Sequence, residues 1–392
     1  DIVEYINHDH DVVKYTKLYT QYGVMFLYFD AILTGISGFH QSLEIVKPFT
    51  IIAVIFIGIN ILSNQMWIYY FNLQFIGSPL ATQFAWILWI AVLYLWCFVY
   101  KKYHLKLGVW NGWSLKETIL NKKRVWEFTK VVLPLTLGQA AESWGYQVVN
   151  LYAARLPPAQ IASLSCSFTV WGIMYAFWGG IGGAILTRVG KKIGAGNVKG
   201  AKMVAKVAFV ISSIVGLIMG CIVFMLSKQI AMLYSNDPEV HEIMSQCVRF
   251  VCIIYVIGSA QWCAINILEA MSKNIAPSVI NVVSSWFGYV PACIYLMTGD
   301  NYKMFGDNTS PVACIFIVGI VVEILRTMSL WCIVCRTDWE KACIAAKERN
   351  EKEEKEKDKD SNDKEAKIDD NKSKIEKSID YVNLEDEQHQ IA

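Results

Sequence analysis

Residues 204–226 read VAKVAFVISSIVGLIMGCIVFML, and Lys206 is their only charged side chain. An α-helix needs about 20 mostly apolar residues to cross a bilayer. This stretch is long enough, and its apolar residues do not alternate with polar ones as they would in a half-buried strand. It therefore predicts a membrane-spanning helix.

Eight further stretches have the same character. Membrane strands are excluded because the apolar runs are too long and too continuous. The nine predicted spans are about 17–39, 49–71, 80–100, 128–152, 161–186, 204–226, 247–268, 278–298 and 311–335. The fold class that follows is an all-α, multi-pass membrane protein.

The charged residues of this 392-residue chain gather at its C-terminal end. They make up 18% of the chain, whereas globular domains carry about 25%. Residues 336–392 contain 13 basic and 18 acidic side chains, which leaves 23 and 16 in residues 1–335. The low-complexity run 351–360 lacks the apolar surface that folding needs, so we predict a disordered tail. Nucleic acid is not an expected partner, because no basic patch is interleaved with aromatics.

The loops predict the topology, because short loops rich in Lys and Arg face the cytoplasm. The basic loops follow the third and fifth stretches, which places the C-terminus in the cytoplasm. Asp9 and Pro48 are 39 residues apart and Asp237 and Pro277 are 40 apart, which suggests a weak internal repeat of a kind typical of transporters. We divide the chain into the last three helices of a first lobe (1–100), a cytoplasmic loop (101–127), a six-helix second lobe (128–337) and the charged tail (338–392). Nine of an expected twelve spanning helices are then visible.

Glu142 lies in the middle of the apolar stretch 128–152. An acid at that depth costs roughly 2.5–3.5 kcal/mol on insertion scales. Two interpretations fit: the carboxylate pairs with a neighbouring helix, or it binds a cation or carries a proton. Burial disfavours the charged form and a nearby cation favours it, so such a group can exchange a proton for a cationic substrate. We favour the second interpretation.

Aromatic side chains accompany Glu142. Trp144 and Tyr146 follow it within a turn, and we assign both to the site. The next apolar stretch adds Trp171, Tyr175 and Trp178. An aromatic face holds an organic cation by about 0.5–2 kcal/mol. For any one of them, packing or a position in an interfacial belt fits equally well.

Three parts of the chain resemble the multidrug and toxic compound extrusion (MATE) family of cation-coupled efflux transporters. The most specific is Thr187–Asn197, TRVGKKIGAGN, followed by Ala201. The others are Leu133-Pro134 with Glu142-x-Trp144-x-Tyr146, and Ile76-Gly77-Ser78-x-Leu80-Ala81 with Asn281 and Tyr289-Val290-Pro291. The resemblance covers about residues 10–345 and implies two six-helix lobes with substrate between them.

The resemblance also implies several acids in the second lobe, and only Glu142 of them is found. The other positions hold Gln147, Thr169 and Gly258. We expect Asp30, in mid-span, to compensate, and we place Glu269 at a membrane interface. Glu323 and Arg326, three residues apart, are expected to form a local ion pair. The predicted substrate- or proton-binding residues are Glu142, Trp144, Tyr146, Gln147 and Asp30.

These features predict a secondary active antiporter that exports organic cations or other xenobiotics in exchange for protons, or else sodium. We expect a monomer in the plasma membrane or in a vacuolar or vesicle membrane. Two alternatives stay open: an exporter of an endogenous metabolite or lipid-linked substrate, and a truncated membrane protein without transport activity. No enzyme, cofactor or metal site is predicted, because Cys332 and Cys335 have no second pair at zinc spacing and the histidines are scattered.

Overall fold

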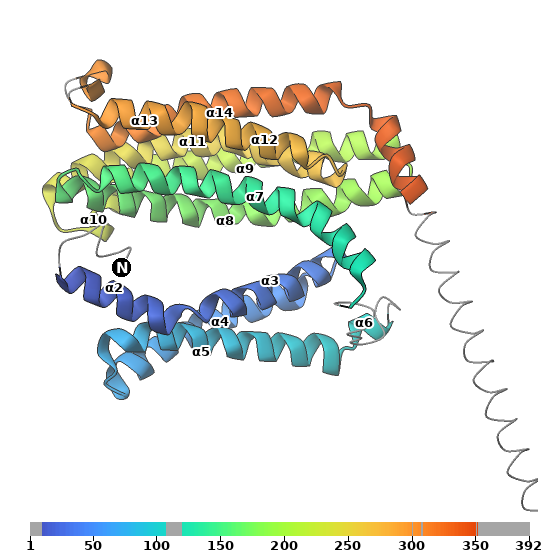
Figure 1. The fold of residues 1–392 in the computed structure, drawn as a ribbon, viewed down its shortest axis with the longest axis horizontal. Coiled ribbons are helices and arrows are strands. Elements are labelled where there is room, and N and C mark those ends of the chain that lie inside the picture. The colour runs from blue at the N-terminus through green and yellow to red at the C-terminus, as the bar shows by residue number, and fades with distance from the viewer. Residues whose placement is uncertain (1–9, 107–119, 300, 307–308, 350, 352–392) are drawn as a thin grey trace, which may run out of the picture. The chain divides into compact units, whose positions relative to one another are not determined.

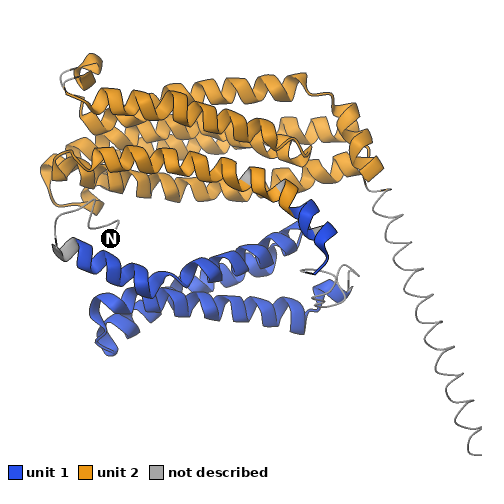
Figure 2. Cartoon of the chain, in the orientation of Figure 1, with its two compact units in different colours: residues 1–128 blue, residues 129–392 orange. Residues whose placement is uncertain are grey.

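The computed structural model describes residues 10–106, 120–299, 301–306, 309–349 and 351, and every regular element within them is a helix (Figure 1). The all-α membrane fold class is thereby confirmed. The chain forms two compact units, residues 1–128 and 129–392 (Figure 2). The predicted division into lobes stays a proposal.

The described elements of the first unit are helices. They are α2 (His10–Gly23), α3 (Phe26–Ser42), α4 (Lys47–Gln65), α5 (Gln74–Tyr94) and the short α6 (Tyr103–Lys106). Of these, α2, α3 and α4 pack against α5. Single π-helical segments, η1 (Met66–Tyr70) and η2 (Leu95–Tyr100), extend α4 and α5. The core of the unit contains Leu33, Ile52, Phe56 and Leu93, with Phe56 stacked on Trp89.

The second unit is built around α11 (Pro238–Ala270), which packs against α8 (Pro158–Gly194), α9 (Val198–Met225) and α14 (Pro311–Arg336). The remaining elements are α7 (Lys122–Ala153) from residue 129 onward, α10 (Ser227–Tyr234), α12 (Ile275–Val283), the π-helical η3 (Ser284–Tyr289), α13 (Val290–Met297) and the 3₁₀ turn η4 (Asn301–Phe305). Small residues bring helices close, as usual in membranes. A Cβ at Gly216 of α9 would lie 2.6 Å from Ser259 Cβ of α11.

The number of spanning helices differs from the nine predicted. Among the described residues, seven helices are long and apolar enough to cross a membrane, or eight if α2 and α3, bent by 44°, form one span. The predicted span 128–152 lies in α7, which is long enough but is not among them. Its polar side chains Gln139, Glu142 and Gln147 line a cavity, and these polar residues lower the mean hydropathy of the helix. α7 also begins at Lys122, inside the predicted loop 101–127.

The C-terminal tail begins later than predicted. Residues 339–349, assigned to the disordered tail 338–392, are helical. Cys343 on this helix is buried in a cluster with Met271 and Val334, and Arg349 donates to Ser272 Oγ at 3.0 Å. The sequence prediction gave weight to the charges and missed the apolar face of this helix. The rest of the predicted tail, 352–392, lies outside the described residues.

A pair of truncations tests this boundary. Ending the chain after Thr337 should lower the melting temperature by a few degrees, because it removes Cys343 and Trp339 from the buried cluster. Ending it after Glu351 should leave the melting temperature unchanged. Tryptophan fluorescence during heating in detergent measures both. Equal melting temperatures for the two truncations would contradict the packing role of 339–349.

Candidate functional site

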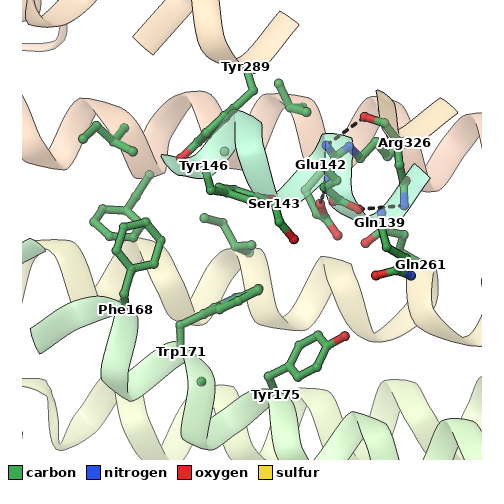
Figure 3. Close-up of a pocket in the computed structure, with 18 of the residues that line it drawn as sticks. Gln139, Glu142, Ser143, Tyr146, Phe168, Trp171, Tyr175, Gln261, Tyr289 and Arg326 are labelled. Atoms are coloured by element: carbon green, nitrogen blue, oxygen red, sulfur yellow. Dashed lines mark hydrogen bonds and ion pairs between the residues drawn. The ribbon is translucent and has the colours of Figure 1, made fainter. Parts of the chain in front are cut away.

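A cavity of about 740 Å³ lies within the second unit. This is within the range of small-molecule pockets, roughly 300–1,000 Å³. Side chains from α7, α8, α11, α12 and α14 line it (Figure 3). Two glycines let α7 approach its neighbours: a Cβ at Gly138 would lie 2.8 Å from Ser278 Cβ, and one at Gly145 would lie 3.4 Å from Val290 Cγ2.

Glu142 is held by two partners from other helices. Arg326 Nη1 donates to Glu142 Oε1 at 2.8 Å, and Asn281 Nδ2 donates to Oε2 at 3.0 Å. Charge-assisted bonds of this kind are among the strongest in proteins. The first interpretation of Glu142, pairing with a neighbouring helix, therefore describes its geometry.

Arg326 is the centre of a buried polar network. Its side chain is 3% exposed. Nε and Nη2 donate to the hydroxyls of Ser284 and Ser285, and Nη2 also reaches the carbonyl of Asn281 at 3.4 Å. Both serines lie on η3, next to Pro291, which cannot donate a backbone hydrogen bond. Such π-helical segments are frequent at functional sites.

Acids outnumber bases on the cavity wall. The ionisable Asp, Glu, Lys and Arg residues that line it are Glu142, Glu269, Glu323 and Arg326. Glu323 Oε2 lies 3.9 Å from Arg326 Nη1, so the predicted local pair exists but is longer than the pair with Glu142. Glu269, which was predicted to lie at a membrane interface, lines the cavity near the C-terminal end of α11.

An aromatic wall stands on α8. Trp171, Tyr175 and Trp178 line the cavity. Tyr175 meets Trp262 edge-on with ring centroids 5.0 Å apart, and Trp178 stacks on Tyr255 at 4.2 Å with an interplanar angle of 10°. In Figure 3, Trp171 and Tyr175 lie across the cavity from Tyr146 and Ser143 of α7. The two walls thus present π-faces and polar groups to the same space.

The position of Gly258 explains the absence of an acid there. A Cβ on Gly258 would lie 2.5 Å from the Trp178 ring and 3.1 Å from Glu323 Oε1. The indole therefore occupies the space that a side chain at 258 needs. Glu323, on α14, brings a carboxylate to the same place.

Only some of the predicted site residues line the cavity. Glu142, Tyr146 and Gln147 line the cavity together. Trp144 does not, and it is 60% exposed, because two residues along an α-helix turn the side chain about 200° away from Glu142. Asp30 lies on α3 in the first unit, and its predicted role is untested.

The sequence analysis did not predict that Arg326 and Asn281 bond to Glu142. Arg326 interrupts an apolar stretch, as Glu142 does, and two opposite charges in separate spans are a signal for pairing. Asn281 carries no such signal. Within the described residues, no group of three or more His, Cys, Asp or Glu side chains is placed to hold a metal ion.

The long apolar helices define an integral, multi-pass membrane protein. Residues 134–294 match the MatE family model. Over these residues the chain resembles the multidrug and toxic compound extrusion (MATE) family, and its curated relatives and solved structural neighbours include transporters of that family.

Its relatives are distant and longer. An uncharacterized transporter of Schizosaccharomyces pombe is 24% identical over 316 residues, 79% of this chain and 55% of that protein. Multidrug and toxin extrusion protein 1 of Oryctolagus cuniculus is 23% identical over 305 residues, 77% and 51% respectively. The crystal structure of the eukaryotic MATE transporter AtDTX14 superposes with a TM-score of 0.78 at 22% identity, covering 89% of this chain and 75% of that one. The chain thus spans about half the length of these two curated relatives.

Proposed function

We propose that this protein is a secondary active antiporter that exports organic cations in exchange for protons, or else sodium, and that Glu142 is the shared binding group. The observation that carries the proposal is the surplus of carboxylates in an aromatic cavity. Three acids and one arginine line it, so one carboxylate is balanced and two negative charges remain if all are ionised. The name of the Oryctolagus cuniculus relative, multidrug and toxin extrusion protein 1, supports the export of drugs and toxins.

Antiport follows from competition at one carboxylate. A proton or a cation on Glu142 excludes the other, and a ligand shifts a conformational equilibrium only by its differential affinity for the two states. Mutual exclusion supplies that difference. We further propose a monomer with a cytoplasmic C-terminus in the plasma membrane or a vacuolar or vesicle membrane.

Transport into proteoliposomes across which an ion gradient is imposed tests the proposal. A proton gradient should drive ethidium, a planar aromatic cation, across the membrane in the direction opposite to proton flow. Ethidium fluorescence is the readout. Replacing the proton gradient by a sodium gradient identifies the coupling ion. Absence of ethidium movement with either gradient would contradict the antiporter proposal.

A second candidate is an exporter of an endogenous metabolite that carries both charges. The observation that favours it is Arg326, because a guanidinium in a cavity is suited to a carboxylate or phosphate group. A zwitterionic ligand would then use Arg326 for its anion and a glutamate for its cation. Such a compound should displace ethidium more strongly than a simple cation of similar size.

Two tryptophans on the second unit form a matched pair for testing the aromatic wall. Trp171→Ala should weaken ethidium binding by about 2- to 30-fold, the equivalent of a cation–π contact of ~0.5–2 kcal/mol. Trp144→Ala removes the same side chain from outside the cavity and should leave affinity unchanged. Fluorescence titration of both purified variants gives the comparison. Equal effects of the two substitutions would contradict the position of the wall.

A further inference from the structure

The guanidinium of Arg326 is itself a cation in the cavity wall, and it is paired with Glu142, the carboxylate that we assign to the substrate. Arg326 Nη1 bonds to one oxygen of Glu142 and Asn281 Nδ2 bonds to the other. Each oxygen of Glu142 thus already accepts one hydrogen bond from a protein donor. An incoming cation therefore competes with Arg326 for the charge of this carboxylate.

A second carboxylate stands beside the same guanidinium nitrogen. Glu323 precedes Arg326 by three residues on α14, and its Oε2 lies 3.9 Å from Nη1. Its side chain is 11% exposed. Because both residues belong to α14, a movement of α7 does not separate Glu323 from Arg326.

The other guanidinium nitrogens are fixed independently of Glu142. Nε and Nη2 bond to Ser284 and Ser285 of η3. A small rotation can thus move Nη1 from Glu142 to Glu323 while these two bonds hold the group in place. Release of Arg326 into the cavity without a partner is disfavoured, because a buried charge that loses its partner is strongly destabilising.

From these contacts we propose that Arg326 is a tethered competitor that sets the specificity of the cavity: a cationic ligand takes the place of Nη1 at Glu142, and Nη1 moves to Glu323. This inference rests on the proposed binding of cations at Glu142. Only cations that bind Glu142 better than the tethered guanidinium gain entry, so weakly bound cations are rejected. The exchange also breaks the ion pair between α7 and α14, which gives bound and unbound states different interhelical contacts.

Ethidium titration of the purified full chain tests the exchange. Glu323→Asp keeps the charge but withdraws the carboxylate by one methylene, so it should weaken ethidium binding about fivefold if Glu323 must receive Nη1. Arg326→Met should tighten binding about tenfold because the competitor is gone. In the Arg326→Met background, Glu323→Asp should have little effect. Glu127→Asp, on an exposed part of α7, is the matched control and should change nothing.

The outcomes separate this inference from the proposed function. Ethidium binding that depends on Glu142 but is unchanged by Glu323→Asp overturns the exchange alone. Weaker binding in Arg326→Met also overturns it, because Arg326 would then help to hold the ligand. If Arg326→Met does not fold, the ethidium affinity of Glu323→Asp alone tests the exchange. Absence of any Glu142-dependent binding overturns both the exchange and the proposed function.

Discussion

Glu142→Gln is expected to reduce proton-driven ethidium flux about 10- to 100-fold. The substitution keeps the size of the side chain and removes its charge, and a charge-assisted contact is worth ~1.5–3 kcal/mol. It also removes the group that exchanges a proton for the cation. Flux into proteoliposomes, normalised to folded protein, measures the effect.

Stability needs a separate control in this experiment, because Arg326 loses its 2.8 Å partner. Breaking a buried ion pair can cost about 3–5 kcal/mol, but here Glu323 and the η3 hydroxyls still compensate the guanidinium. Glu127→Gln is the matched variant: the same chemical change on the same helix, at an exposed position. It should transport normally. Full transport by Glu142→Gln would contradict the assignment of Glu142 as the group that binds both the proton and the cation.

Gly258→Ala is expected to be the most damaging small substitution near the cavity. The new methyl would lie 2.5 Å from the Trp178 ring, which is itself stacked on Tyr255. The indole must shift, and overpacking of this kind typically costs about 1–3 kcal/mol. We expect a lower melting temperature together with weaker ethidium binding, because Trp178 belongs to the cavity wall.

Gly172→Ala is the control for that substitution. Gly172 lies in α8, the helix of Trp178, and lines the cavity, but a Cβ there meets nothing within 4 Å. Alanine also favours a helix more than glycine does, so stability should be unchanged or slightly higher. Thermal unfolding of both variants, followed by ethidium titration, makes the comparison. A tolerated Gly258→Ala would show that Trp178 is free to move.

The helices could be predicted from the sequence because apolar length is a local property. The stretch 311–335 corresponds to α14, Pro311–Arg336, and 49–71 corresponds to α4 with η1. The exceptions are informative. α7 is less apolar than the other spans because its polar face lines a cavity, and 339–349 is helical because its apolar face packs on α11 and α14.

The site could be predicted only in part, because the missing information is the rotation and packing of helices. Glu142, Tyr146 and Gln147 lie on one face of α7, whereas Trp144 lies on the other. Sequence spacing predicted the contact of Arg326 with Glu323, three residues away. It gave no distance for Glu142, which lies 184 residues from Arg326 and is nevertheless the nearer partner.

The polar network also changes the meaning of Glu142. From sequence it is a costly acid in an apolar span, and the cost itself suggested a function. In the fold, Arg326 and Asn281 offset much of that cost. A functional role therefore depends on whether a ligand can displace Arg326, and not on burial alone.

Equilibrium binding of ethidium to the purified protein and to Glu142→Gln tests the central claim most directly. It requires neither a gradient nor a defined orientation in a membrane. We predict saturable binding that weakens about 10- to 100-fold in Glu142→Gln and is unchanged in Glu127→Gln. Equal affinity of the normal protein and Glu142→Gln would contradict a cation site at this carboxylate.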